Sequence, residues 1–232
     1  DQLKPFYPKE KVIEMLLEAD DDTQKLVDLS VKAFTEETSR ESPAPGGGTI
    51  AACMGAMGAA LGTMVANLSA HKRGWDERWE EFSRWAEKGQ ALQSRLLRLI
   101  DDDTAAFNEI MAAFGMPKSN DEEKALRSAA IQTATLHAAQ VPLETMKTAF
   151  EAFALCKAMA ENGNPNSISD AGVGALAIRA AVRGACMNVK INASSLKDRS
   201  LAEPLIAEAD RIAEEADREE AAITSFINAR LV

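Results

Sequence analysis

Three consecutive aspartates, Asp101, Asp102 and Asp103, are the residues of this chain best suited to proton transfer. They lie in a segment whose apolar residues recur with helical period, and Asp103 falls within about 20° of Leu92 on that apolar stripe. A carboxylate on a core-facing stripe is costly unless it is paired or protonated, so we expect Asp103 to have a raised pKa and to transfer protons. The alternative is a structural carboxylate that accepts hydrogen bonds from a neighbouring helix.

Two further carboxylates are candidates for a second catalytic group. Asp101 points to the face of the helix opposite Asp103, whereas Asp102 lies to the side and is interpreted as solvated surface. Asp170 lies in a polar, glycine-containing helix start that spans residues 162–174 and includes Asn164. Taken by itself, that segment is better explained as an ordinary loop and helix cap. If it met another helix start at one end of a bundle, the two would form a pocket lined with backbone donors.

A turn with three successive glycines, Gly46, Gly47 and Gly48, follows Pro45 and leads into a helix of small residues. Glycines allow a ligand or another backbone to approach closely, and free N–H groups at a helix start attract negative charge. The turn matches neither the dinucleotide-binding glycine pattern nor a phosphate-binding P-loop, so it could also be a turn without a ligand. The helix that follows carries small residues along one face, which predicts close packing at the centre of a bundle.

Lys72 and Arg73 form a basic pair beside the apolar segment, and they could anchor an anionic substrate tail or lie at an ordinary surface turn. Arg179 and Arg183, one helical turn apart, could also bind an anion, or could pair with carboxylates. The chain has two histidines and three cysteines, none with metal-ligand spacing, so we predict no metal site.

The composition limits the classes of partner. A formal net charge of −10 argues against nucleic acid and anionic membranes as partners. An odd number of cysteines without paired spacing indicates reduced thiols and a cytoplasmic protein. Residues 42–70 contain no charge and could span a bilayer by length, but they are rich in Ala, Gly and Met, which favours a buried core helix.

These candidate residues require helices to position them, because the chain lacks runs of β-branched residues and strict polar alternation. We therefore predict an all-α, up-and-down antiparallel bundle with long helices and no β-sheet. Residues 1–38 are expected to form an N-terminal arm with two short helices, and residues 39–232 the bundle. The predicted helices span residues 9–19, 23–38, 50–70, 75–114, 121–161 with a kink at Pro142, 167–191 and 201–231.

A set of motifs occurs in a characteristic order along this chain. They are Pro43-Ala44-Pro45-Gly46-Gly47-Gly48-Thr49, Asp101-x-Asp103 with Ala106-Phe107, Met116-Pro117-Lys118, Val141-Pro142-Leu143, Gly163-Asn164, Ser169-Asp170-Ala171-Gly172-Val173-Gly174-Ala175 and Asn188-Val189-x-Ile191-Asn192. From residue 39 onward the sequence resembles the family of formimidoyltetrahydrofolate cyclodeaminases and methenyltetrahydrofolate cyclohydrolases. Residues 3–14 also resemble the stretch that precedes the cyclodeaminase part of bifunctional formiminotransferase-cyclodeaminases.

The resemblance implies an all-α fold, a homodimer or higher homo-oligomer with the site in a groove near the subunit interface, and a tetrahydrofolate substrate that can carry a polyglutamate tail. It implies no metal and no cofactor beyond tetrahydrofolate. On this basis we expect substrate binding by Pro45, Gly46, Gly47, Gly48, Lys72, Arg73, Lys118 and Asn164. A formiminotransferase domain or protein is a further expected partner.

The expected reaction converts 5-formimidoyltetrahydrofolate to 5,10-methenyltetrahydrofolate and ammonia, with Asp103 as the proton-transfer group and Asp101 or Asp170 as a second carboxylate. The alternative reaction is the interconversion of 5,10-methenyl- and 10-formyltetrahydrofolate by a cyclohydrolase. A hypothesis of another class is a helical scaffold without catalysis, in which the glycine helix serves only oligomerisation.

Overall fold

A computed structural model describes residues 25–42 and 44–231 of the chain. In this part the secondary structure consists of six α-helices and three short 3₁₀ helices, without a β-strand. The elements are η1 (Leu26–Asp28), α3 (Val31–Thr38), α4 (Gly47–Ala70), η2 (Asp76–Arg78), α5 (Trp79–Gly115), α6 (Asp121–Asn162), η3 (Pro165–Ser167), α7 (Ile168–Ser194) and α8 (Arg199–Asn228). The prediction of an all-α bundle is confirmed.

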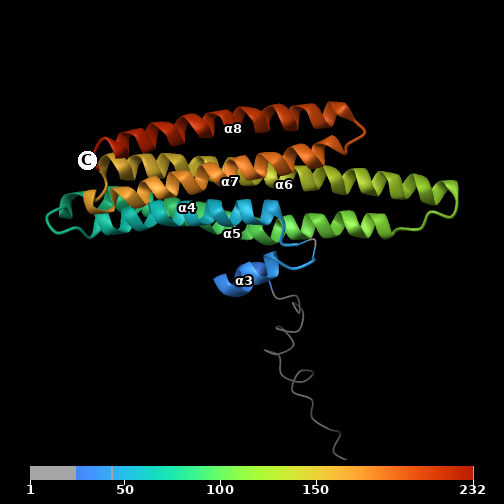
Figure 1. Ribbon diagram of the computed structural model, residues 1–232, viewed down its shortest axis with the longest axis horizontal. Coiled ribbons are helices and arrows are strands. Elements are labelled where there is room, and N and C mark those ends of the chain that lie inside the picture. Colours follow the sequence, from blue (N-terminus) through green and yellow to red (C-terminus); the bar gives the residue numbers. More distant parts are fainter. Residues whose placement is uncertain (1–24, 43, 232) are drawn as a thin grey trace, which may run out of the picture.

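The five long helices run nearly parallel to one another, and short loops reverse the chain direction between them (Figure 1). Helix α4 packs against α5, α6 and α7 and so occupies the centre, while α8 covers α6 and α7 from outside. Because α5 and α6 are longer than their neighbours, their hairpin extends past the start of α4 and the end of α7 (Figure 1). The start of α4 therefore lies beside the middle of the α5–α6 hairpin.

Small residues allow α4 to lie close to the helices around it, as the sequence predicts. A Cβ at Gly58 would lie 2.8 Å from the carbonyl oxygen of Gly174 on α7, and one at Gly62 would lie 2.8 Å from Leu155 on α6. Neither distance leaves room for a methyl group, so larger residues would push the helices apart. The glycines thus bring α7 and α6 into contact with the α4 backbone.

The apolar stripe of α5 is buried only where α4 covers it. Leu92, Leu96 and Ile100 are buried, whereas Met111 and Phe114, near the tip of the hairpin, are about half exposed. Sequence periodicity gives these last turns the same stripe as the rest of the helix. At these turns the stripe does not face a core, because the hairpin projects beyond its neighbours (Figure 1).

The N-terminal region differs from the prediction of one helix over residues 23–38. The structure has the short helix η1, then extended residues, then α3, which Ser30 caps by accepting a hydrogen bond from the Ala33 N–H. The helix predicted over residues 9–19 lies outside the described residues. Segment 26–39 packs over α4 and α5 and encloses an apolar cavity of about 630 Å³ with them.

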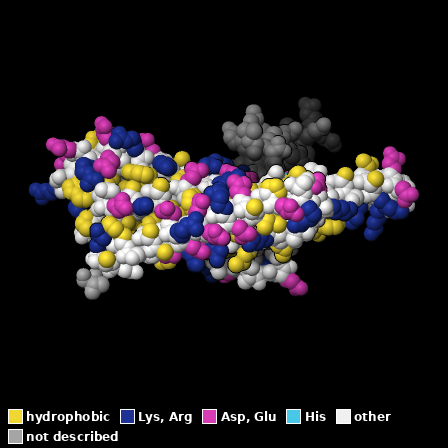
Figure 2. All heavy atoms as spheres, turned by 90° about the horizontal axis from the view of Figure 1, so that it is seen from above, with side chains coloured by type: hydrophobic (Ala, Val, Ile, Leu, Met, Phe, Trp, Pro, Cys, Tyr) yellow, Lys and Arg dark blue, Asp and Glu magenta, His cyan; other side chains and the backbone are white. Residues whose placement is uncertain are grey.

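Charged side chains tie α8 to the bundle. Lys190 pairs with Asp210, Arg179 with Asp217, and Lys147 with Glu208. Figure 2 shows this face, where basic and acidic side chains are interspersed, and the narrow projection formed by the hairpin. Arg179 and Arg183 are candidates from the sequence for binding an anion. Both lie within ion-pair distance of Asp217, so they pair with a carboxylate, which is the alternative predicted for them.

Helix α4 is the one helix of the described chain that is long and apolar enough to cross a membrane, with a mean hydropathy of 1.6 over its most apolar window. In that window 61% of the residues are buried inside the bundle. This burial agrees with the interpretation of α4 as a core helix.

Candidate functional site

The site is organised around the contact between the start of α4 and the middle of α5. The Thr49 hydroxyl donates a 2.8 Å hydrogen bond to Asp103 Oδ2 and accepts a 3.2 Å hydrogen bond from the Gly46 N–H. Thr49 is fully buried and occupies the third position of α4. One threonine therefore fixes both the glycine turn and the carboxylate that the sequence singled out.

Two opposing influences act on the Asp103 carboxyl. Burial raises its pKa above the ordinary value of 3.8, and hydrogen bonds from the side chain and backbone of Thr49 lower it in part. The net direction is upward. A carboxyl with a raised pKa keeps a larger protonated fraction near neutral pH, which suits a group that must both donate and accept protons.

Asp103 faces a small polar cavity of about 210 Å³. Its lining comes from the glycine turn, from α5, from one residue of α6, and from the last two turns of α7. The lining residues are Ala44, Gly46, Gly47, Gly48, Asp103, Thr104, Phe107, Ile110, Ala138, Asn188 and Asn192. Every polar side chain in this list comes from a helix, so the functional groups are held on rigid elements rather than on loops.

Two of the three glycines are needed for close approach. A Cβ at Gly48 would overlap the carboxylate of Asp103, and a Cβ at Gly47 would lie 3.3 Å from Asn188 Nδ2. The N–H groups of Gly47 and Gly48 occupy the first turn of α4, where no helical carbonyl is available to accept from them. The turn thus lets the carboxylate lie against the backbone and provides donors at the cavity wall.

Asn192 owes its position to a proline on the neighbouring helix. Pro142 lies inside α6 and has no N–H, so the carbonyl of Ala138, four residues earlier, loses its helical partner. The side-chain amide of Asn192 donates to this carbonyl at 2.6 Å. Asn188, one turn earlier, donates in the same way to the Gly184 carbonyl of its own helix, at 3.0 Å. Each asparagine donates one of its two side-chain N–H groups to a backbone carbonyl, which fixes the orientation of the amide beside the cavity.

Thr104 differs from the other polar residues of the site because its hydroxyl makes no hydrogen bond. Its hydroxyl oxygen is buried, and within the described part of the chain it has no hydrogen-bond partner. Buried polar atoms in folded proteins are nearly always paired, so an unpaired one at a cavity wall requires an explanation.

The structure does not bring the other predicted carboxylates to this cavity. The Asp101 Oδ1 atom accepts a 2.9 Å hydrogen bond from the Leu26 N–H and so holds the N-terminal segment. Asp170 lies in the first turn of α7. Because α7 runs antiparallel to α4, this turn lies near the end of α4, where the backbone N–H of Asn164 donates to Ser69. The two helix starts therefore lie at opposite ends of α4, about 33 Å apart at 1.5 Å per residue, and do not form one pocket within the chain.

The predicted substrate-binding residues are distributed over three places. Gly46, Gly47 and Gly48 line the cavity, and Pro45 is buried next to it after a cis peptide bond. The basic pair follows the end of α4, where the Lys72 ammonium lies 4.0 Å above the ring of Trp75. Lys118 is exposed in the loop at the tip of the α5–α6 hairpin.

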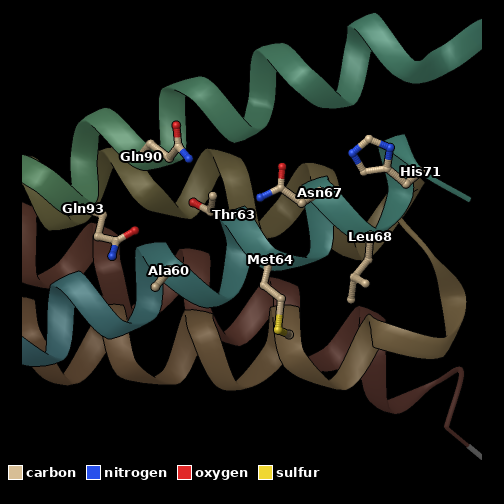
Figure 3. Close-up of a pocket in the computed structure, with 8 residues that line it drawn as sticks. All are labelled: Ala60, Thr63, Met64, Asn67, Leu68, His71, Gln90 and Gln93. Carbon is tan, nitrogen blue, oxygen red and sulfur yellow. The ribbon is translucent and has the colours of Figure 1, made fainter. Parts of the chain in front are cut away.

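Three other cavities of the described chain are larger. One, of about 320 Å³, is an open site lined by Glu81, Arg84, Trp85 and Lys88. The remaining two contain no carboxylate among the described residues that line them. The cavity beneath segment 26–39 is lined almost entirely by apolar side chains. The other, of about 500 Å³, is an open groove beside the end of α4 (Figure 3). Helix α5 contributes Gln90 and Gln93 to this groove, and Asn67 and His71 line its other side. Among the described residues no group of three or more potential ligands is placed to hold a metal ion.

Sequence reasoning found Asp103 and the glycines but did not assign roles to Thr104, Asn188 and Asn192. A signal was present for the asparagines, because they stand one helical turn apart on an otherwise apolar helix. No comparable signal exists for Thr104, because threonine in a helix normally satisfies its hydroxyl on the preceding turn.

Comparison with known proteins agrees with this architecture. A family profile described as formiminotransferase-cyclodeaminase matches residues 30–211. A methenyltetrahydrofolate cyclohydrolase of Methylorubrum extorquens is 42% identical over 187 residues, which are 81% of this chain and 90% of that protein. A formimidoyltransferase-cyclodeaminase of Rattus norvegicus is 34% identical over 230 residues, which are 99% of this chain and 42% of the rat protein. This chain thus spans less than half the length of that relative.

A solved structure has the same fold. The crystal structure of formiminotetrahydrofolate cyclodeaminase from Thermotoga maritima matches with a TM-score of 0.79 and 26% sequence identity, covering 90% of this chain and all of that one.

Proposed function

The chain belongs to the formiminotransferase-cyclodeaminase family, and from this premise we propose that it acts on a reduced folate as a cyclodeaminase. The reaction converts 5-formimidoyltetrahydrofolate to 5,10-methenyltetrahydrofolate with release of ammonia. The observation that carries the proposal is Asp103, a half-buried carboxyl with a raised pKa, held by Thr49 at the wall of a polar cavity.

The proposed chemistry needs one group that moves protons in both directions. N10 of the folate attacks the carbon of the protonated formimidoyl group and gives a tetrahedral intermediate that carries the former imine nitrogen as a neutral amine. N10 must then lose a proton, and the amine must gain one before it leaves as ammonia. Asp103 accepts the first proton and supplies the second, which leaves its own protonation state unchanged at the end of the cycle. Positioned proton transfer of this kind contributes typically about 10²- to 10⁴-fold in rate.

The glycine turn has a second role in this proposal. The N–H groups of Gly47 and Gly48 provide donors beside the carboxylate, and such donors can bind a carbonyl or an anionic group of the ligand. Because Gly48 has no side chain, the Asp103 carboxylate lies directly against this backbone. Substrate and carboxylate are thus held on the same wall.

A specific observation favours a second candidate function. The Methylorubrum extorquens relative, which matches 90% of its length, is a methenyltetrahydrofolate cyclohydrolase. In that reaction water attacks the methenyl carbon, a proton is released and the ring opens to 10-formyltetrahydrofolate. The same carboxyl could take the proton from water. Measuring ammonia released from 5-formimidoyltetrahydrofolate, and separately the hydrolysis of 5,10-methenyltetrahydrofolate, distinguishes the two reactions.

The test of the proposal is Asp103→Asn, which keeps the shape of the side chain and removes the titratable group. We expect kcat to fall by about 10²- to 10⁴-fold with a smaller effect on KM. The control is Asp102→Asn, because Asp102 is the exposed neighbour on the same helix and should keep normal turnover. Near-normal turnover of Asp103→Asn would show that proton transfer runs through another group.

A non-catalytic helical scaffold is the alternative of a different class. Isothermal titration of the unmodified chain with tetrahydrofolate separates it from the enzyme, because a scaffold has no reason to bind a reduced pterin. Absence of heat from binding, together with absence of turnover, would favour the scaffold.

A further inference from the structure

The hydroxyl of Thr104 is the one buried side-chain oxygen or nitrogen of the described residues that lacks a hydrogen-bond partner. Other buried threonines in the bundle behave differently. Thr63, Thr135 and Thr145 each donate to the carbonyl four residues earlier in their own helix. Thr104 makes no such bond to Ile100, and it lines the polar cavity beside Asp103. An unpaired buried hydroxyl reduces stability, so its position at the cavity points to a partner that arrives with a ligand.

The opposite wall of the cavity indicates what kind of ligand this is. Asn188 and Asn192 each donate one side-chain N–H to a backbone carbonyl, and the oxygen of each amide can accept a hydrogen bond from a ligand. The cavity thus combines acceptors from α7 with a hydroxyl from α5. The ring of a reduced pterin carries N–H donors next to a carbonyl oxygen and matches this set.

We propose that Thr104 contacts the substrate directly, with its hydroxyl donating to the pterin carbonyl while the oxygens of Asn188 and Asn192 accept from the ring N–H groups. This inference rests on the proposed function and deepens it, because it assigns ring recognition to residues separate from the proton-transfer group. In this arrangement Asp103 acts on the reacting atoms, and Thr104 sets the affinity for the ring.

This assignment predicts that removing the Thr104 hydroxyl weakens tetrahydrofolate binding without lowering the stability of the free protein. Thr104→Val keeps the branched shape and removes the hydroxyl. In the free protein this removes an unpaired polar atom from a buried position, so we expect the melting temperature to stay equal or to rise by about 2 to 4 °C. In the complex it removes a hydrogen bond, so we expect the dissociation constant for tetrahydrofolate to rise by about 3- to 10-fold. A threonine with only a structural role would not produce this combination.

The experiment measures tetrahydrofolate binding by isothermal titration and stability by thermal unfolding for the unmodified chain and three variants. Thr104→Val is the test, and Thr104→Ser, which keeps the hydroxyl, should bind within about twofold of the unmodified chain. Thr145→Val is the control, because the Thr145 hydroxyl is also buried in a helix but bonds to that helix away from the cavity. It should lower stability or leave it unchanged and should not alter affinity.

Steady-state kinetics add a second readout. We expect Thr104→Val to raise KM with little change in kcat, whereas loss of the Asp103 carboxyl lowers kcat. Unchanged affinity and unchanged KM for Thr104→Val would overturn the inference while the proposed function stands. Absence of tetrahydrofolate binding by the unmodified chain would overturn the proposed function and this inference with it.

Discussion

At the scale of single residues, Asp103 shows how a helical pattern can identify a functional group. A carboxylate on an apolar stripe cannot be explained by solubility, and the structure supplies the reason for its presence, which is the Thr49 hydroxyl and a polar cavity. The sequence could not supply the partner, because Thr49 is 54 residues away and its contact depends on how α4 crosses α5. Asp101 illustrates the limit of such reasoning, since its partner is the backbone N–H of Leu26, which carries no side-chain signal.

The raised pKa of Asp103 predicts how this residue changes stability with pH. Below the ordinary value of 3.8, the carboxyl is protonated in both the folded and the unfolded chain and has no effect on their balance. As the pH rises, the carboxyl ionises first in the unfolded chain, so folding loses stability until the pH exceeds the raised folded-state pKa. We therefore expect the free energy of unfolding of Asp103→Asn, minus that of the unmodified chain, to grow with pH and then level off. Each unit of raised pKa contributes about 1.4 kcal/mol to the plateau.

Urea unfolding at pH values from about 3 to 8 measures this difference, because the free energy of unfolding falls linearly with urea and each midpoint can be converted to a free energy. Asp102→Asn serves as the exposed control and should show no comparable rise. A difference that shrinks as the pH rises would mean that the hydrogen bonds from Thr49 outweigh burial and stabilise the ionised form.

At the scale of elements, the long helices follow from sequence periodicity and from their breaks. The predicted ends at residues 70, 114 and 161 lie within one residue of the observed ends of α4, α5 and α6. The predicted helix over residues 23–38 was wrong because the apolar residues from Leu26 to Phe34 pack on α4 and α5 as a short 3₁₀ helix, an extended link and one short helix. Contacts with other elements decided that local structure, and these are not visible in a local pattern.

Helices α6 and α7 are coupled through a proline and an asparagine. Without Asn192, the Ala138 carbonyl would be left buried and without its helical donor, because Pro142 cannot supply one. We expect Asn192→Ala to lower the free energy of unfolding by about 1–3 kcal/mol. In the Pro142→Ala background the helix regains an N–H for that carbonyl, so the same substitution should cost clearly less. A double-mutant cycle by urea unfolding measures the coupling.

Equal costs of Asn192→Ala in both backgrounds would contradict this explanation and would assign the effect to lost packing. The exposed Asn108 on α5 provides a control, because Asn108→Ala removes an amide of the same size from a position outside the cavity. It should leave stability nearly unchanged in either background.

At the scale of the whole molecule, the predicted site residues separate into groups that one chain cannot bring together. The cavity lies at the start of α4, the basic pair and Asn164 lie at its other end, and Lys118 lies at the tip of the hairpin. The predicted up-and-down bundle already implies that α4 and α7 run antiparallel, and the structure shows that this course places these residues at opposite ends of α4. Any joint role in one site would therefore need a second chain.

One face of the molecule is suited to such a second copy. Along α4 and the adjacent α7, exposed apolar side chains face outward and include Met57, Leu176, Met187 and Ile191, each at least half exposed, with Arg183 as a charged residue among those of α7. The α8 face differs, because basic and acidic side chains are interspersed there (Figure 2). Clusters of exposed apolar side chains are typical of interfaces.

We expect the chain to form a homodimer through this α4–α7 face. A twofold axis across the face would run each helix antiparallel to its copy, and so would place the basic pair and Asp170 of one chain towards the Asp103 end of the other. Sedimentation velocity should give twice the chain mass of 25.0 kDa, and Met187→Glu, at a side chain that is 70% exposed, should shift the population to the monomer. Leu201→Glu, on α8, is the matched control and should remain dimeric. A monomeric unmodified chain would contradict the interface, and a fully active Met187→Glu monomer would show that Asp103 works without residues from a second chain.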